Sequence, residues 1–306
     1  MPNNAAIIGA RSTEHGPIHV IISHDVDSLY VPGGLKRLRS FIHPKLWLRL
    51  SHLLFTGKIS LHRFWVIFSY HFRKTVHNIP ALVDFDKAHG VKATYFFIMN
   101  QSQCKKDGLG SAYTPEEAKP LIDFVRANGF DAGVHGIVFN DSAGMKAERD
   151  TWAALMGTPP DCIRNHYVRY DDKTFERLSE LGYVYDSTEF HKPERCTIKA
   201  PYKVGSMWEF PLNIMEGYLP NEPHNTEGYL ASLEQLQGET LRIIGELQEK
   251  GIKYLTVLFH DHGFCECKEA YMNWYKWFVS YVEETPGFEI VSYREAIALL
   301  EGDAVR

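Results

Sequence analysis

A buried strand that ends in carboxylates is the feature that most constrains the fold of this chain. The stretch IHVIISHDVDS begins at Ile18, and its first residues are mostly apolar and β-branched. Asp25 and Asp27 then follow, and no further Asp or Glu occurs until Asp84. An apolar run of this kind predicts a strand buried within a sheet, with two carboxylates presented where the strand ends.

Strand-like and helix-like segments alternate along most of the remaining chain. VKATYFFI, residues 91–98, predicts a buried strand, and the next helix has a capping box at Thr114 and Glu117 and a stop at Gly129. The alternation continues through DAGVH, TFERLSELG, YVYDS, SLEQLQGETLRIIGELQEKG with Ser232 as its cap, KYLTVLFHDHG and FEIVSYREAIALLEG. Roughly six or seven such units predict a parallel sheet with crossover helices, closed or nearly closed into an α/β barrel.

Polar side chains follow several of the predicted strands. They are Asp25 and Asp27; His135; Arg164, His166 and Arg169; and His260, Asp261 and His262. Because the carboxyl ends of parallel barrel strands share one face, these groups are expected to converge there. Asp and His ligands with an open position suit zinc or a similar divalent ion that activates water. A second carboxylate would serve as general base, and a His from another strand would protonate the leaving group.

The order of the motifs resembles the polysaccharide deacetylase family, the NodB-homology carbohydrate esterases. The matching stretches are SHDVDS, GVKATYFFIMN, DAGVHGIVFND, IRNHYVRY and LTVLFHDH, between about Ile18 and Leu300. The resemblance implies one catalytic domain over residues 1–306, folded as an irregular (β/α)7-type barrel, a distorted TIM barrel. A bacterial subgroup that removes N-acyl groups from lipid-linked sugars or O-antigen precursors of lipopolysaccharide is also similar.

The resemblance also implies a metal site. In HDVD, Asp25 matches the family's base and Asp27 its first metal ligand, and His135 matches the first of two histidines spaced four apart. Phe139 stands where the second histidine is expected. We expect Asn140 to replace that ligand, with Asp141 as the other candidate, and because an amide is a weaker ligand than an imidazole, metal affinity would be reduced. The expected ion is one zinc, with manganese, cobalt and nickel as alternatives.

The remaining site residues follow from the later motifs. By resemblance, Arg164 orients the base, the backbone near Tyr167 supplies the oxyanion donor, and His260 is the general acid. His166, Arg169 and Asp141 are expected to contact substrate. The implied reaction is metal-dependent removal of an acetyl or formyl group from the nitrogen of an amino sugar.

Other interpretations of the same residues stay open. An O-deacetylase would need the same groups, and Phe139 favours a catalytically inactive barrel that binds saccharide at a membrane. The carboxylates could cap a turn, His135 could be a core residue, and the two arginines could form surface ion pairs. HDHGFCEC could hold a separate zinc through His260, Asp261, His262, Cys265 and Cys267.

A basic, aromatic segment follows the Asp pair. Between Ser28 and Val83 the chain has nine Lys or Arg and no Asp or Glu, so this segment contributes +9 and the remainder −14 to the net charge of −5. We expect a helical insertion at about residues 34–78. Its composition suits an anionic membrane surface. Nothing in it resembles a nucleic-acid recognition motif, so nucleic acid is not expected as a partner. Packing of the aromatics onto the barrel is the alternative.

The expected location is the cytoplasm, with peripheral attachment to the inner face of the membrane as a further expectation. The five cysteines are scattered and odd in number, which argues against a disulfide framework and for a reducing compartment. The N-terminal residues do not read as a secretory signal, and no apolar run is long enough to cross a bilayer.

Overall fold

A curled, mostly parallel sheet organises the protein. In the computed structural model the described residues are 16–30, 44–70, 73–100, 113–220 and 231–303. Within these ranges ten strands form one sheet in the order β6-β7-β5-β4-β3-β2-β1-β9-β8, and β10 also pairs with β1. The strands are β1 (Ile18–Val26), β2 (Thr94–Ile98), β3 (Asp131–Gly136), β4 (Cys162–Asn165), β5 (Tyr185–Asp186), β6 (Tyr202–Val204), β7 (Met207–Glu209), β8 (Ile214–Met215), β9 (Tyr254–Leu258) and β10 (Phe288–Ile290).

Strand β1 lies in the middle of the sheet and is buried along its whole length. It pairs in parallel with β2, β9 and β10. Because side chains alternate along a strand, Ile21 and Asp25 share one face while Ile22 and His24 share the other. Ile21 packs in the cluster that includes Phe96 and Tyr293, whereas Ile22 belongs to the larger core beneath the helices. The predicted buried strand is confirmed, and its alternation sends Asp25 inward.

The chain between β7 and β8 draws the two ends of the sheet together. Strand β7 pairs with β5, and β8 pairs with β9. Between them, the Phe210 amide donates to the carbonyl of Asp186, and the Asn213 amide donates to the carbonyl of Thr256. The described sheet therefore curls into an irregular barrel in which β7 and β8 share one position, as the (β/α)7-type prediction required.

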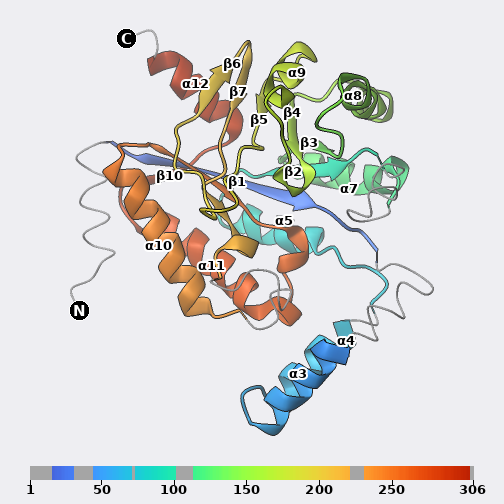
Figure 1. Ribbon diagram of the computed structural model, residues 1–306, viewed down its shortest axis with the longest axis vertical. Helices are drawn as coiled ribbons and strands as arrows, with labels where there is room; N and C mark the ends of the chain where they lie inside the picture. The colour runs from blue at the N-terminus through green and yellow to red at the C-terminus, as the bar shows by residue number, and fades with distance from the viewer. Residues whose placement is uncertain (1–15, 31–43, 71–72, 101–112, 221–230, 304–306) are drawn as a thin grey trace.

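Helices cover the outside of this barrel (Figure 1). They are α5 (Ile79–Ala88), α7 (Pro115–Ala127), α8 (Ser142–Met156), α9 (Thr174–Glu180), α10 (Leu233–Glu249), α11 (Glu269–Glu284) and α12 (Tyr293–Asp303). The capping box at Thr114 and Glu117 is present at the start of α7, and Ser232 caps α10, so both predicted starts are confirmed. The sequence analysis did not predict α8 or α11.

Two further helices form a hairpin between β1 and α5. They are α3 (Pro44–Phe55) and α4 (Leu61–Tyr70), and in Figure 1 they project from one end of the molecule. The predicted insertion is helical in these ranges, while its residues 34–43 and 71–72 lie outside the described residues. One side of the hairpin rests on a loop in which Cys265 and Cys267 form a disulfide. This disulfide joins two residues that are two positions apart in the sequence, so it does not form a disulfide framework. Cys162 and Cys196 are free, and Cys104 lies outside the described residues.

We predict that Gly133 is required for the close pairing of β3 with β4. A Cβ at this position would lie 2.2 Å from Cys162 Sγ and 2.8 Å from the carbonyl oxygen of the same residue. Gly133→Ala should therefore lower the free energy of unfolding by about 1–3 kcal/mol, the usual cost of overpacking.

The matched control is Gly238→Ala on α10, where a Cβ would meet no atom within 4 Å. This change should raise stability by roughly 0.5–1 kcal/mol, because alanine favours a helix over glycine. Urea denaturation measures both variants. Equal stability of Gly133→Ala and the wild type would contradict the prediction.

Candidate functional site

The candidate site lies where β1, β3, β4 and β9 end. Neighbouring strands are in parallel register, with His135 of β3 opposite Arg164 of β4. Strand β1 carries Asp25 and leads into Asp27, and His260 lies two residues after the end of β9. The structure thus brings these five side chains together from four strands, as expected for the carboxyl ends of a parallel barrel.

Arg164 and Asp25 form a fully buried ion pair. Arg164 Nη1 donates to Asp25 Oδ1 at 2.9 Å, and the side chain of Asp25 is 3% exposed. The guanidinium also lies over the ring of Phe96, with Cζ 4.6 Å from the centroid. Its remaining donors bind the Ser187 carbonyl and the hydroxyls of Ser23, Ser187 and Tyr293. Burial lowers the pKa of Arg164, but Asp25 outweighs this effect, so the guanidinium stays charged and holds Asp25 in one orientation.

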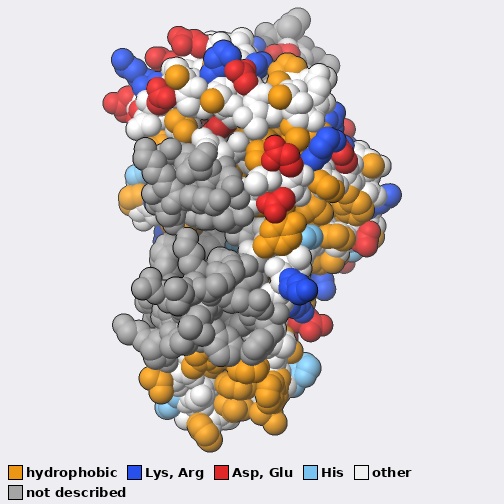
Figure 2. All heavy atoms as spheres, turned by 90° about the vertical axis from the view of Figure 1, so that its right-hand side faces the viewer, with side chains coloured by type: hydrophobic (Ala, Val, Ile, Leu, Met, Phe, Trp, Pro, Cys, Tyr) orange, Lys and Arg blue, Asp and Glu red, His pale blue; other side chains and the backbone are white. Residues whose placement is uncertain are grey.

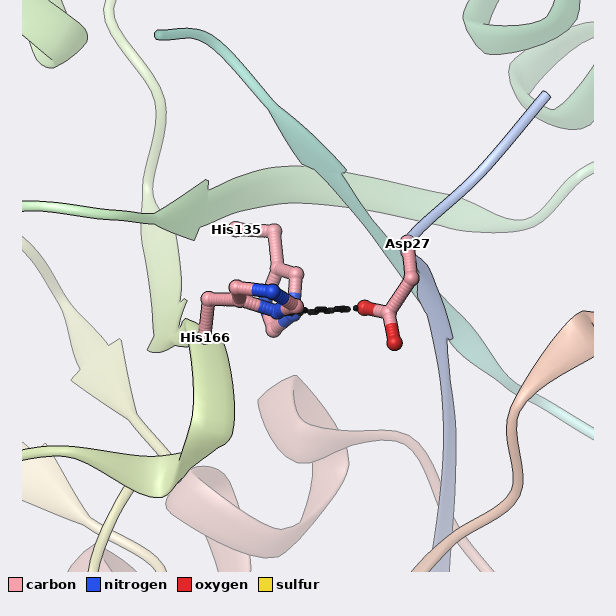
Figure 3. A group of neighbouring side chains, drawn as sticks. All are labelled: Asp27, His135 and His166. Carbon is pink, nitrogen blue, oxygen red and sulfur yellow. Dashed lines mark hydrogen bonds and ion pairs between the residues drawn. The ribbon is translucent and has the colours of Figure 1, made fainter. Parts of the chain in front are cut away.

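Asp27, His135 and His166 form the group suited to a metal ion (Figure 3). Asp27 Oδ1 is 3.2 Å from His135 Nε2 and 3.2 Å from His166 Nδ1, and the two nitrogens are 3.0 Å apart. All three ligand atoms lie within 4.8 Å of one another. Both imidazoles are buried, whereas the side chain of Asp27 is 22% exposed and is reached by solvent.

The hydrogen bonds around this group fit a divalent ion. His135 Nδ1 lies 2.9 Å from the carbonyl oxygen of Arg164, so this nitrogen carries the proton and Nε2 offers its lone pair. That lone pair faces His166 Nδ1 and the Asp27 carboxylate, an arrangement that a shared cation stabilises. Burial raises the pKa of Asp27, but His166, His135 and His260 together lower it well below its usual value. Two imidazoles and one carboxylate match a catalytic zinc site with an open fourth position.

Phe139 cannot coordinate a metal ion. Its ring instead packs against the side chain of Arg169. The guanidinium of Arg169 lies over the Phe139 ring at 4.9 Å, and Arg169 Nη2 donates to the carbonyl of Ile137 at 2.7 Å. Asn140 is exposed. Asp141 is also exposed, and its side chain accepts from the Gly144 amide as the N-cap of α8. Arg169 and Asp141 thus have structural contacts. The third residue of the group with metal-ligand spacing is His166, and the expectation that Asn140 supplies this ligand stays a prediction.

His260 is held by a carboxylate that the sequence analysis missed. Glu216 Oε1 lies 2.6 Å from His260 Nδ1 and also accepts from the His260 amide. The other nitrogen, Nε2, is 3.7 Å from Asp27 Oδ2 and faces the site. Burial lowers the pKa of His260, but Glu216, followed by Asp27 and Asp25, raises it to about 10. His260 is therefore a protonated imidazolium at neutral pH, with its free N–H directed into the site.

Tyr167 follows His166 in an unusual backbone conformation. Its φ is 58°, and that of Val168 is 45°, in the left-handed region that residues other than glycine rarely adopt. The Tyr167 side chain is 52% exposed. Such strain is kept where the surrounding structure requires it, often at functional sites. Here the turn reverses the chain directly after β4 and leaves His166 Nδ1 against Asp27.

The rival zinc site at HDHGFCEC is disfavoured by its own contacts. Cys265 and Cys267 are bonded to each other, so neither offers a thiolate. His262 Nδ1 contacts Lys268 Nζ at 3.0 Å, and burial together with Lys268 lowers the pKa of His262 well below its usual value. Asp261 accepts from the Asn78 amide. In the described part of the chain, Asp27, His135 and His166 are the group found with metal-ligand spacing.

The fold has known counterparts among solved structures. A protein assigned as a polysaccharide deacetylase from Mycobacterium smegmatis aligns with a TM-score of 0.58 and 12% identity, over 95% of this chain and 92% of its own. One from Pseudomonas aeruginosa gives 0.57 and 14%, over 94% and 91%. A structure described as Puue allantoinase gives 0.57 and 12%, over 92% and 89%.

Comparison by sequence adds nothing to this likeness. No family model and no curated protein matches the chain. At such low identity the alignments establish the fold, and the allantoinase shows that one fold hosts more than one activity. The chain therefore has the NodB-type barrel of the polysaccharide deacetylases.

Proposed function

We propose that the protein is a metal-dependent hydrolase that removes an N-acyl group, acetyl or formyl, from an amino sugar. The observation that carries the proposal is the meeting of three units at one end of the barrel. These units are the Arg164–Asp25 pair, the Asp27, His135 and His166 ligand group, and the Glu216–His260 pair. A base, a metal site and an acid are what amide hydrolysis needs.

Asp25 is the base in this mechanism. A divalent ion held by Asp27, His135 and His166 would polarise the acyl carbonyl and lower the pKa of water. Asp25 accepts the proton of the attacking water, through the oxygen that Arg164 leaves available. This oxygen, Oδ2, is 3.6 Å from His135 Nε2 and therefore lies beside the ligand group. The backbone at Tyr167 is proposed to donate to the oxyanion.

His260 completes the reaction by protonating the departing nitrogen. Glu216 holds Nδ1, so the proton for transfer is on Nε2, the atom that faces Asp27. This pair supports an amide over an ester substrate, because an amine leaves only after protonation and Glu216 stabilises the protonated donor. With His166 as the proposed third ligand, the ligand set is complete even though Phe139 replaces a histidine. This supports an active enzyme over an inactive barrel.

The proposed substrate is an amino sugar in a polysaccharide or in a lipid-linked precursor such as that of O-antigen. Support comes from the resemblance of the motifs and from the basic, aromatic insertion, which begins directly after Asp27. A sugar attached to a lipid is met at a membrane surface, so the proposed location is the cytoplasm at the inner face of the membrane.

The first prediction concerns the proton-transfer residues. Asp25→Asn and His260→Ala should each lower kcat by about 10²–10⁴, the usual contribution of a positioned acid or base. The assay compares matched N-acetyl and O-acetyl amino sugars, with circular dichroism to confirm folding. Near-normal turnover by a folded Asp25→Asn protein would refute the mechanism. Faster cleavage of the O-acetyl sugar than of the N-acetyl sugar would show that the protein is an O-deacetylase.

The second prediction separates the two candidates for the third metal ligand. His166→Ala should weaken zinc binding more than the roughly 10- to 100-fold that loss of an outer contact costs. Asn140→Ala is the control and should leave zinc affinity unchanged, because Asn140 is exposed. Competition with a chromophoric chelator measures both. Greater weakening by Asn140→Ala would return the ligand role to that residue.

The third prediction tests the contact between Glu216 and His260. Glu216→Gln removes the neighbouring charge that most raises the pKa of His260. Activity requires protonated His260, so it persists below the apparent pKa and is lost above it. The alkaline limb of the kcat/KM profile should therefore move to lower pH in the variant. An unchanged alkaline limb would remove His260 from the role of acid.

A further inference from the structure

The hairpin of α3 and α4 exposes four large apolar side chains. Leu48 is 70% exposed, Phe55 89%, Leu61 60% and Trp65 55%. Leu48 and Phe55 lie two turns apart on α3, and Leu61 and Trp65 lie one turn apart on α4, so each pair shares a helix face. We call these four residues the hairpin surface. Figure 2 shows hydrophobic side chains gathered at the end of the molecule where Figure 1 places the two helices.

Most contacts that hold the hairpin together come from other residues, although the Trp65 ring also packs edge-on against Phe68, with centroids 5.2 Å apart. The two helices of the hairpin pack through rings of their own, with Trp47 5.5 Å from Phe68 and 6.3 Å from Phe64. The opposite side is anchored by Leu50 and Ile67, which are fully buried against the Cys265–Cys267 loop. The hairpin therefore has an inner apolar side that fixes it to the protein and an outer apolar side that faces solvent.

The charge of the hairpin indicates what the outer side binds. Residues 44–70 contain four Lys or Arg residues and no Asp or Glu, within the longer stretch from Ser28 to Val83 that has nine cations and no acidic residue. Arg49 and Lys58 are exposed on the hairpin, next to Leu48 and close in sequence to Phe55. A helical face of leucine and aromatic side chains flanked by cations matches the boundary of an anionic bilayer, where rings enter the interface and cations meet phosphate. No helix among the described residues is long and apolar enough to span a membrane, so the contact would be interfacial.

The base of the hairpin is fixed beside the candidate site. The Val76 amide donates to the carbonyl of Leu29, two residues after Asp27, and the Asn78 amide donates to the carboxylate of Asp261, next to His260. Arg63 of α4 pairs with Glu269 at the start of α11. These contacts thus connect the hairpin, and with it the hairpin surface, to the loops that carry Asp27 and His260.

We infer that the hairpin surface docks the protein on an anionic lipid bilayer and so presents the site to a lipid-linked sugar. The inference of membrane docking depends on the hairpin alone, whereas the lipid-linked sugar as substrate depends on the proposed function. The partner is a negatively charged membrane surface of phospholipid, recognised by apolar insertion together with cation–phosphate attraction.

The test is sedimentation of the full chain with vesicles of phosphatidylcholine containing increasing phosphatidylglycerol. Binding should rise with the anionic lipid and fall with salt. Leu48→Ser with Phe55→Ser should weaken partitioning at least about tenfold, since burial of such side chains is lost. The matched control is Leu299→Ser on α12, which is 39% exposed and should bind as the wild type does.

A charge variant tests the electrostatic part. Arg49→Glu with Lys58→Glu should weaken binding by about 25-fold or more, at roughly fivefold for each cation near the surface. Lys250→Glu with Lys253→Glu changes the net charge equally away from the hairpin and should have a much smaller effect.

Hydrolysis of a soluble amino-sugar fragment is measured in parallel and should be unchanged in all of these variants. The Asp25→Asn protein should bind vesicles normally, so loss of catalysis and loss of docking are distinguishable. Absence of vesicle binding at low salt overturns the inference. So does equal binding to neutral vesicles, or self-association that the Leu48 and Phe55 changes abolish, which would assign the surface to a second copy of the chain.

Discussion

The ion pair between Arg164 and Asp25 is the interaction on which the site depends. A guanidinium with no solvent exposure is tolerated only when its charge is compensated and its donors are used, and here every nitrogen has a partner. Those partners come from β1, from the residues after β5 and from α12, so the same contacts also hold the barrel's inner face together. Because removing one ion of a buried pair typically costs about 3–5 kcal/mol, the position of the proposed base, Asp25, is coupled to the stability of the fold.

The position of Arg164 also bears on the proposed metal site, which has no histidine at position 139. Its carbonyl fixes the tautomer of His135, and its strand ends at Asn165, directly before His166. The left-handed turn at Tyr167 then keeps His166 Nδ1 beside Asp27. The segment from Arg164 to His166 thus supplies the residue that orients the proposed base, the group that orients one proposed ligand, and the proposed third ligand. In this proposal the third ligand comes from the turn after β4 in place of the loop after β3.

Sequence patterns predicted β1 and the capped helices α7 and α10, because these elements carry local signals that tertiary contacts do not override. The convergence of Asp25, Asp27, His135, Arg164 and His260 also followed from strand ends alone. Glu216 was missed since β8 has only two residues and gives no periodic signal. Whether His166 or Asn140 would face Asp27 depended on a positive φ at Tyr167, a non-glycine residue, and no sequence pattern specifies that.

The segments that hold the hairpin in place also contact the loops of the candidate site. One leg of the insertion leaves from the residues after Asp27, and the other returns to Asn78, whose amide binds Asp261. The Asp261 carboxyl has a pKa raised by burial to about 8, and one of its oxygens has no partner among the described residues, so this contact is held by few bonds. The Val76 amide also donates to the carbonyl of Leu29, so the chain after the hairpin is tied both to the loop that carries His260 and to the residues that follow Asp27. In the proposed function, docking would therefore act on the loops of the proposed acid and of the proposed ligand Asp27, while Arg164 of β4 holds Asp25 independently of the hairpin.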